Sequence, residues 1–188
     1  GQIVCTGGTD VSTGLPVTVS FKSPVSSEYV TPLTSIISDL MSDGRGAEQA
    51  QELLRQTFQI DDSVNLLNFD SVAEAANGNE QSLNVLNAST QVAVTLSMVN
   101  SMFDSQSEDG SESSGMSGQI CKAIASQILN SSDQNFNLTA PSTVQGVLNH
   151  SIADSNLSLD QETKEVAAYL ISSMNHTLKQ NSLGNLDP

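Results

Sequence analysis

The sequence predicts a mainly α-helical fold: a helical bundle around a central helix at about residues 80–103, with a short β appendage at the N-terminus. Nearly every apolar pattern after Val30 repeats at the three- and four-residue spacing of a helix. The segment 80–103 is apolar around most of its circumference, as expected of a helix surrounded by others. Only residues 3–21 contain the alternation of a half-buried strand.

We expect residues 1–24 to form the β appendage and residues 25–188 to form the helical domain. One or two strands do not make a stable sheet in water, and buried backbone groups need hydrogen-bond partners. We therefore expect the β stretch to complete its hydrogen bonding with another chain, its strands lent to a neighbouring subunit. The predicted interface residues are Ile3, Val4, Val17, Val19 and Phe21. The alternatives are a hairpin folded back on its own helices, or pairing with an upstream domain, since Gly1 in place of Met is typical of a processed chain.

Helix signals follow in order along the chain. Thr31 and Pro32 predict an N-cap and first helical residue, and Gly44 a C-cap. Residues 47–58 form a second helix, and Asp70 caps a short third helix that ends near Ala76.

The C-terminal third of the chain predicts three more helices. One carries a stripe from Ile120 to Ile128, the next begins at Pro141, and a capping box of Ser158 and Gln161 opens the last. In the last helix we expect an inward stripe. Its members are Val166, Ala167, Leu170, Met174 and Leu178.

Residues 104–118 are acidic and rich in Ser and Gly, a composition that predicts a flexible, solvated loop. Its carboxylates supply the hard oxygens that Ca²⁺ prefers, which makes a weak calcium site the alternative. The candidate ligands are Asp104, Glu108, Asp109 and Glu112. Their spacing does not match the Asp-x-Asp-x-Asp-Gly calcium pattern, so the solvated loop is preferred.

The chain contains two cysteines, Cys5 in the β stretch and Cys121 in a predicted helix. In an exported protein two cysteines most simply pair with each other. We therefore predict a Cys5–Cys121 disulfide that ties the appendage to the helical body, with two separate buried thiols as the alternative.

Composition and charge exclude several classes of function. The net charge of −15 argues against binding to nucleic acid or to anionic membranes, which both require a basic surface. No apolar run approaches the length of a membrane span. No nucleophile, phosphate-loop or metal motif accompanies the two histidines, His150 and His176, so we expect no enzyme and no cofactor.

Two motifs, Gly-Gly-Thr-Asp-Val-Ser-Thr-Gly-Leu-Pro at residues 7–16 and Val-Thr-Pro-Leu-Thr-Ser-Ile-Ile at residues 30–37, resemble a segment that recurs in large secreted bacterial surface proteins. In those proteins the segment follows an immunoglobulin-like or prealbumin-like β region and leads into helices. The resemblance covers residues 1–70 and implies export and a structural or adhesive role.

Six Asn-x-Ser/Thr sequons allow glycosylation if the producing cell has the machinery, although chance in a chain rich in Asn, Ser and Thr explains most of them. They are Asn87, Asn130, Asn137, Asn149, Asn156 and Asn175. Together these features predict a non-enzymatic structural subunit of an extracellular or cell-surface filament that associates with itself. The alternative is a ligand- or Ca²⁺-binding module of a secreted adhesin.

Overall fold

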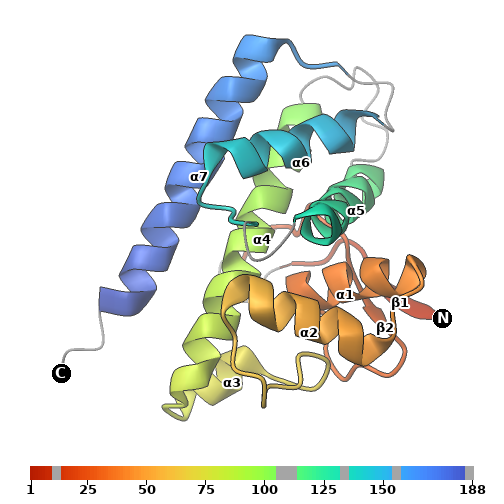
Figure 1. Cartoon of the computed structure of the whole chain (residues 1–188), viewed down its shortest axis with the longest axis vertical. Helices are drawn as coiled ribbons and strands as arrows, with labels where there is room; N and C mark the ends of the chain where they lie inside the picture. The colour runs from red at the N-terminus through yellow and green to blue at the C-terminus, as the bar shows by residue number, and fades with distance from the viewer. Residues whose placement is uncertain (10–13, 105–113, 132–135, 154–157, 185–188) are drawn as a thin grey trace.

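The computed structural model describes residues 1–9, 14–104, 114–131, 136–153 and 158–184. Within them the chain forms a two-stranded antiparallel sheet and seven helices, which confirms the predicted fold class (Figure 1). The elements are β1 (Gln2–Cys5), β2 (Phe21–Pro24), α1 (Pro32–Ser42), α2 (Ala47–Phe58), α3 (Ser71–Ala76), α4 (Glu80–Asp104), α5 (Ser114–Asn130), α6 (Pro141–Ala153) and α7 (Gln161–Gly184).

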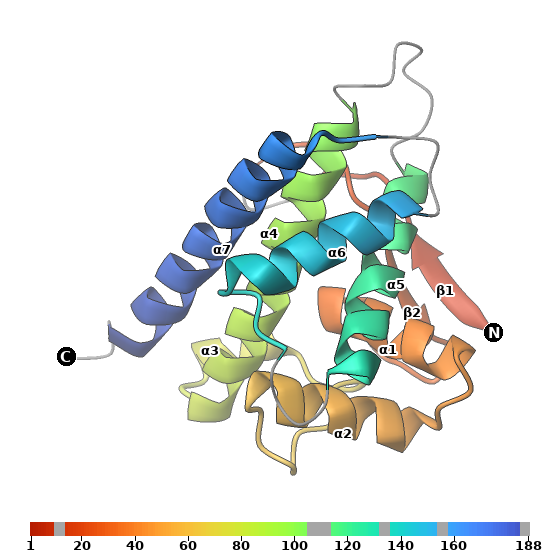
Figure 2. The same cartoon turned by 45° about the horizontal axis from the view of Figure 1, so that its top comes forward.

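Helix α4 is the centre of the bundle, as predicted. It packs against α1, α2, α3, α5 and α7, and it runs through the middle of the molecule in both views (Figures 1 and 2). Its most deeply buried face carries Val92, Leu96, Val99 and Phe103. A helix with neighbours on most sides needs apolar residues around most of its circumference, which is why its pattern lacks a single stripe.

Helix α1 shows how closely local signals can specify an element. The Thr31 hydroxyl accepts a hydrogen bond from the backbone N–H of Thr34, and the backbone N–H of Thr31 donates one to the Thr34 hydroxyl. Pro32 follows at the first helical position. Leu33, Ile36 and Leu40 are buried on the face that this periodicity predicts.

Helix α5 begins earlier than its apolar stripe suggests. Residues 114–118 are helical, and Met116 and Ser117 are buried, so the prediction of a flexible loop over 104–118 is wrong at its C-terminal end. Asp104 belongs to the last turn of α4. The Ser117 hydroxyl accepts a hydrogen bond from the backbone N–H of Ser20, a contact that hydropathy alone does not reveal.

Helix α7 is capped by Asp160 and not by Ser158. The Asp160 carboxylate accepts hydrogen bonds from the backbone N–H and the hydroxyl of Thr163, and these bonds lower the pKa of Asp160. The cap therefore lies one residue before the helix, as the usual geometry requires.

The inward face of α7 also differs from the prediction. Ala167, Ala168, Ile171 and Asn175 are buried, and Val166, Leu170 and Met174, which were expected inward, are exposed. The two stripes are one residue apart, or about 100° around the helix. Small residues on the buried stripe let α7 lie close to α4 and α6, so the larger apolar side chains face outward.

Candidate functional site

The N-terminal sheet is the part of the molecule at which an interaction site was expected. β1 and β2 pair antiparallel in one chain, with Ile3 opposite Ser23, Val4 opposite Lys22 and Cys5 opposite Phe21. The β stretch is therefore a hairpin folded on its own helices, the alternative to strands lent to another chain.

Helices cover the outer edge of β2 with side chains in place of a third strand. The backbone N–H of Lys22 donates to the Ser35 hydroxyl at 2.9 Å, and the Lys22 carbonyl accepts from the Thr34 hydroxyl at 3.0 Å. Both hydroxyls belong to α1, whose polar row at this face is fully buried. The backbone of β2 is thus satisfied without a neighbouring chain.

Helix side chains also take the place of a neighbouring strand along the segment that leads into β2. The N–H of Ser20 donates to the Ser117 hydroxyl of α5 at 3.2 Å, and the carbonyl of Thr18 accepts from the Asn100 amide of α4 at 3.5 Å. Alternate residues therefore direct their backbone groups at helix side chains, with the two-residue period of a strand.

A buried ion pair joins β2 to α1. Lys22 Nζ lies 2.5 Å from Asp39 Oδ1, and the Asp39 side chain is only 3% exposed. Burial raises the pKa of Asp39, and the hydrogen bond and positive charge of Lys22 oppose this shift. The pair holds β2 in register with α1, because a buried carboxylate that loses its partner is strongly disfavoured.

β1 presents an open edge. In an antiparallel pair, opposed residues direct their backbone groups either at each other or both away. Since the groups of Lys22 point toward α1, those of its partner Val4 point away from β2. The same alternation places the outward groups of Gln2 on this edge, opposite Pro24, which has no N–H to lose.

The side chains of β1 are exposed as well. Ile3 is 41% exposed and Val4 54% exposed, and all four residues of the strand lie at the surface. We call the outward backbone groups of Gln2 and Val4, together with the exposed side chains of Ile3 and Val4, the open edge. An apolar strand edge of this kind is a template for the addition of another strand.

The other predicted interface residues are not available for such a contact. Val19 is 6% exposed and belongs to the chain's own core, and Val17 and Phe21 pack against that core. Their apolar alternation reflects burial beneath helices, so the prediction that they face another subunit is corrected. Of the five, only Ile3 and Val4 remain at the surface.

The predicted Cys5–Cys121 disulfide is absent, and both thiols are free. Cys5 lies exposed on β1, and Cys121 is buried in α5. β2 separates the exposed strand from the helical core, so the two thiols lie in different layers. Burial raises the pKa of Cys121 to about 12, which describes an inert core thiol.

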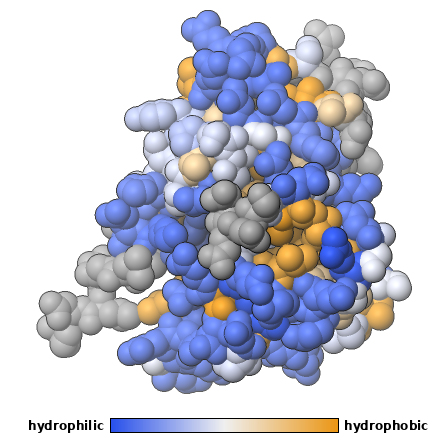
Figure 3. Space-filling model, viewed as in Figure 1, coloured by the Kyte–Doolittle hydropathy of each residue, from blue (hydrophilic) through white to orange (hydrophobic). Residues whose placement is uncertain are grey.

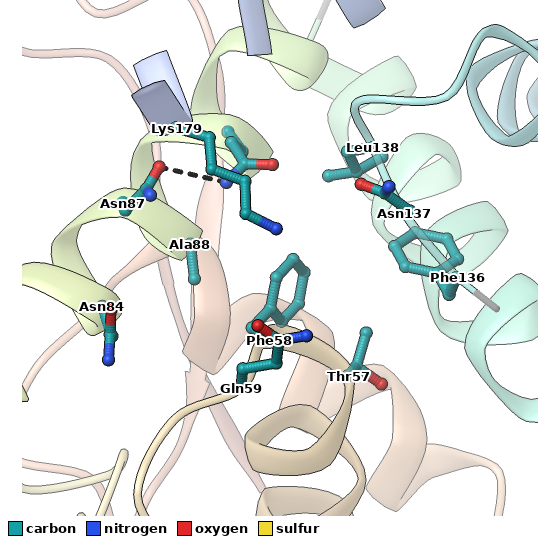
Figure 4. A pocket seen from close by; sticks show the side chains of 11 residues that line it. Thr57, Phe58, Gln59, Asn84, Asn87, Ala88, Phe136, Asn137, Leu138 and Lys179 are labelled. Atoms are coloured by element: carbon teal, nitrogen blue, oxygen red, sulfur yellow. Dashed lines mark hydrogen bonds between the residues drawn. The ribbon is translucent and has the colours of Figure 1, made fainter. Parts of the chain in front are cut away.

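A polar cavity lies between α2, α4 and α7 and the segment that precedes α6 (Figure 4). Its volume is about 190 Å³, and an edge-to-face pair of Phe58 and Phe136 forms part of its wall. Lys179 contributes a positive charge to the lining of the cavity, together with several amides. One of them, Asn87, accepts a hydrogen bond from Gln91. The cavity is smaller than a typical ligand pocket. Two of its amides, Asn87 and Gln91, already bond to each other, and the Asn137 amide oxygen accepts from Thr139.

The sequons divide by exposure. Asn130 and Asn149 are exposed, and Asn156 lies outside the described residues. Asn137 is exposed, and its side chain accepts two hydrogen bonds from Thr139. Asn87 is half-buried in the cavity wall.

Asn175 is the exception among the sequons, because its side chain is fully buried. Its amide donates to Thr95 Oγ1 and to the carbonyl of Leu138, both at 3.1 Å. A glycan on Asn175 is incompatible with this fold, so that candidate is withdrawn. The buried amide instead ties α7 to α4 and to the segment before α6.

The calcium candidates stay untested. Glu108, Asp109 and Glu112 lie outside the described residues, and Asp104 is described only as the end of α4. Among the described residues no group of three or more His, Cys, Asp or Glu side chains is arranged to hold a metal ion. His150 and His176 both lie exposed, and the His176 ring contacts only Gln180 among the hydrogen bonds of the described part.

The sequence did not predict the side chains that complete the sheet, namely Thr34, Ser35, Asp39, Asn100 and Ser117. The polar residues of α1 do recur at helical spacing, but this pattern ordinarily marks a solvated face. None of the described helices is apolar over a length sufficient to cross a membrane.

Comparison with protein-family models, with curated proteins and with solved structures finds no match to this chain. The surface of the face in Figure 3 is largely hydrophilic, with one larger hydrophobic area to the right of centre. The open edge of β1 is therefore the feature from which a function is best argued.

Proposed function

We propose that the chain is a non-enzymatic structural subunit of an extracellular or cell-surface assembly, and that copies associate through the open edge of β1. The observation that carries the proposal is the contrast in hydrogen bonding across the sheet. Helix side chains satisfy β2, whereas the outward groups of Val4 have no hydrogen-bond partner within the described part of the chain. Pairing with another strand stabilises such an edge, because it provides the missing hydrogen-bond partners.

The partner is a second copy of the chain. A strand edge is completed by another strand edge, and the described residues contain only one that is uncovered. Two β1 strands that pair antiparallel would join two hairpins into a four-stranded sheet, which is above the size at which a sheet becomes independently stable. Ile3 and Val4 of both copies would then cover each other.

The export that this role requires is supported by the resemblance of residues 7–16 and 30–37 to secreted surface proteins. The excess of acidic over basic residues is in keeping with a partner that is protein and not nucleic acid. The adhesin alternative has less support: among the described residues no group of three or more His, Cys, Asp or Glu side chains is arranged to hold a metal ion, and the polar cavity beside Lys179 has a volume of only about 190 Å³.

The test is a proline on the open edge. Val4→Pro removes a backbone N–H that points away from β2, so the intramolecular hairpin keeps its hydrogen bonds while strand addition is blocked. Val4→Thr is the matched control, because it retains the N–H and a β-branched shape. Assembly of the purified chain is measured by analytical ultracentrifugation and electron microscopy.

We expect the wild-type and Val4→Thr chains to associate and the Val4→Pro chain to lose that contact, with the same helical circular dichroism in all three. Equal association of Val4→Pro and Val4→Thr would overturn the proposal, as would a wild-type chain that stays monomeric at high concentration. Truncation at Ser23 is a poorer test, because it also removes Val19 from the core.

A further inference from the structure

The polar cavity between α2, α4 and α7 differs in charge from the chain as a whole. The chain contains 21 Asp and Glu residues against 6 Lys and Arg, yet no acidic residue of the described part lines this cavity. Its one charged lining residue, Lys179, is half-buried and has no ion pair or side-chain hydrogen bond within that part. In Figure 4 the Lys179 side chain extends from α7 into the cavity, toward Phe58. A half-buried ammonium group without a partner attracts an anion.

A buried amide in the cavity wall also lacks a partner. The side chain of Gln91 is only 6% exposed, and among the described residues its one hydrogen bond is the one that its nitrogen donates to Asn87. The carbonyl oxygen of Gln91 and the NH₂ group of Asn87 are left without partners in this part of the structure. Buried polar groups in proteins are nearly always hydrogen-bonded, so these groups indicate that water or a ligand occupies the cavity.

Gln59 lines the cavity from a backbone position that favours glycine. It is the C-cap of α2, with a φ of 57°, and among the described residues it is the only one other than glycine with a positive φ. Any side chain at such a position costs stability relative to glycine. The Gln59 side chain adds one more amide to the lining of the cavity.

The lining suits a molecule that carries several hydroxyl groups. Amide and hydroxyl side chains provide both donors and acceptors, which are the partners that sugar hydroxyl groups require. Phe58 and Phe136 provide an apolar wall against which the C–H face of a ring can lie. The polar members of the lining are Thr57, Gln59, Asn84, Asn87, Gln91 and Asn137.

Size and charge narrow the class of ligand further. The volume of about 190 Å³ lies below the roughly 300–1,000 Å³ of pockets for drug-sized molecules, so the ligand has about one ring. A singly charged carboxylate fits better than a phosphate, because α2 ends at this cavity and the dipole at a helix C-terminus disfavours a second negative charge. An amino acid fits less well, since no carboxylate of the described lining can receive its ammonium group.

We propose that this cavity binds a sugar acid of monosaccharide size. The carboxylate contacts the amine of Lys179, the hydroxyl groups bond to the amides of the wall, and the ring lies against Phe58. The acidic residues elsewhere in the chain do not prevent this binding, because charges more than about 8 Å away are largely screened at physiological ionic strength. The site goes beyond the proposed function and does not depend on the contact through β1.

The experiment is saturation-transfer difference NMR on the full chain with sodium glucuronate as the probe. Glucose, acetate and a phosphorylated glucose are the comparison ligands, all at the same ionic strength. The method detects small ligands on a monomer or on an assembly alike, so its result is independent of the β1 contact. We expect saturable binding of glucuronate, and binding at least about tenfold weaker for the other three, because none of them combines a sugar ring with a carboxylate.

Lys179→Met removes the positive charge and keeps an unbranched side chain. We expect it to weaken glucuronate binding at least about tenfold, with unchanged circular dichroism. Lys164→Met is the matched control, because Lys164 is also half-buried on α7 but does not line the cavity, and it should bind glucuronate like wild type.

Several outcomes would overturn the proposal. One is the absence of saturable transfer to glucuronate, and another is equal affinity of wild type and Lys179→Met. Glucose, acetate or phosphorylated glucose binding as tightly as glucuronate would also refute a site for a sugar acid. Methyl glucuronoside then distinguishes two sources of the ligand: binding like that of glucuronate supports a terminal residue of a glycan, and loss of binding supports a free sugar acid.

Discussion

The two strands of the N-terminal sheet have the same length and pair with each other, yet their surroundings are opposite. β2 lies on α1, and hydroxyls from α1 complete its backbone hydrogen bonds; β1 is exposed at every residue. The difference teaches that a strand does not need a second strand on its outer edge if a helix presents short polar side chains at the right spacing. It also identifies β1 as the strand whose outer edge is uncovered among the described residues.

This contrast explains why α1 carries a polar row that is buried. Thr34, Ser35 and Asp39 would ordinarily weaken a helix packed in a core, since a buried polar group without a partner is costly. Here each of them contacts the backbone or side chain of Lys22. The helix and the strand therefore provide hydrogen-bond partners for each other.

The largest expected difference between the two sides of the sheet is the reactivity of their cysteines. The pKa of Cys121 rises from 9.0 to about 12, so its thiolate fraction at neutral pH falls roughly a thousandfold. Cys5 on β1 is exposed. We expect a thiol reagent to modify one cysteine per folded chain rapidly and the second only after denaturation.

Mass spectrometry of the modified chain identifies which thiol reacted, and Cys5→Ser should abolish the rapid phase. Rapid modification of two thiols in the folded chain would contradict the burial of Cys121. No modification of the denatured, unreduced chain would show instead that a disulfide exists.

The next largest difference is expected in the free energy of unfolding, when a valine on each side of the sheet is replaced by aspartate. Val19→Asp places a carboxylate in the core just before β2 and should lower the free energy of unfolding by about 3 kcal/mol or more. Val4→Asp puts the same group on the exposed strand and should change it by less than about 0.5 kcal/mol. Urea denaturation at a concentration too low for association measures both.

Similar losses for the two variants would mean that β1 is covered in the isolated chain, and the contrast between the strands would disappear. A loss of unfolding free energy in Val19→Asp alone would support the assignment of the β2 side as the covered side of the sheet.

The sequence predicted the helices better than the sheet, for a physical reason. The caps at Thr31 and Asp70, the start at Pro141 and the central position of α4 follow from local geometry and periodicity. The alternation of Val17 and Val19 predicted a strand, but these residues lie before β2 in a segment that is not a strand. The alternation reports burial and not the identity of the covering group. Helices of the same chain and strands of another chain produce the same pattern.

The same limit applies to α7 and to the candidate site. Two stripes one residue apart, one through Val166 and Leu170 and the other through Ala167 and Ile171, both satisfy the helical period. Which stripe is buried depends on how closely the neighbouring helices approach, which only the assembled bundle determines. The side chains of Asn100 and Ser117 likewise meet the β segment across a distance in sequence that no local pattern spans.

The smallest expected effect concerns the ion pair on the covered side. Burial raises the pKa of Asp39 in the folded chain above its ordinary value of 3.8 despite the contact with Lys22. As the pH rises from below 3.8, the Asp39 carboxyl group loses its proton first in the unfolded chain. In the folded chain it loses that proton only at a higher pH. The folded state then binds more protons, so the contribution of Asp39 to the free energy of unfolding falls through this window.

The measurement is the difference in unfolding free energy between wild type and Asp39→Asn as a function of pH. The other carboxylates contribute equally to both chains, so their contributions cancel in this difference. We expect this difference to fall as the pH rises through the window and then to stay level. Asp160→Asn is the control of opposite sign: hydrogen bonds from Thr163 lower the pKa of Asp160, so wild type should gain stability relative to that variant as the pH rises toward 3.8. If the Asp39 difference also rose with pH, the attraction of Lys22 would outweigh burial, and the pKa of Asp39 in the folded chain would lie below its ordinary value of 3.8.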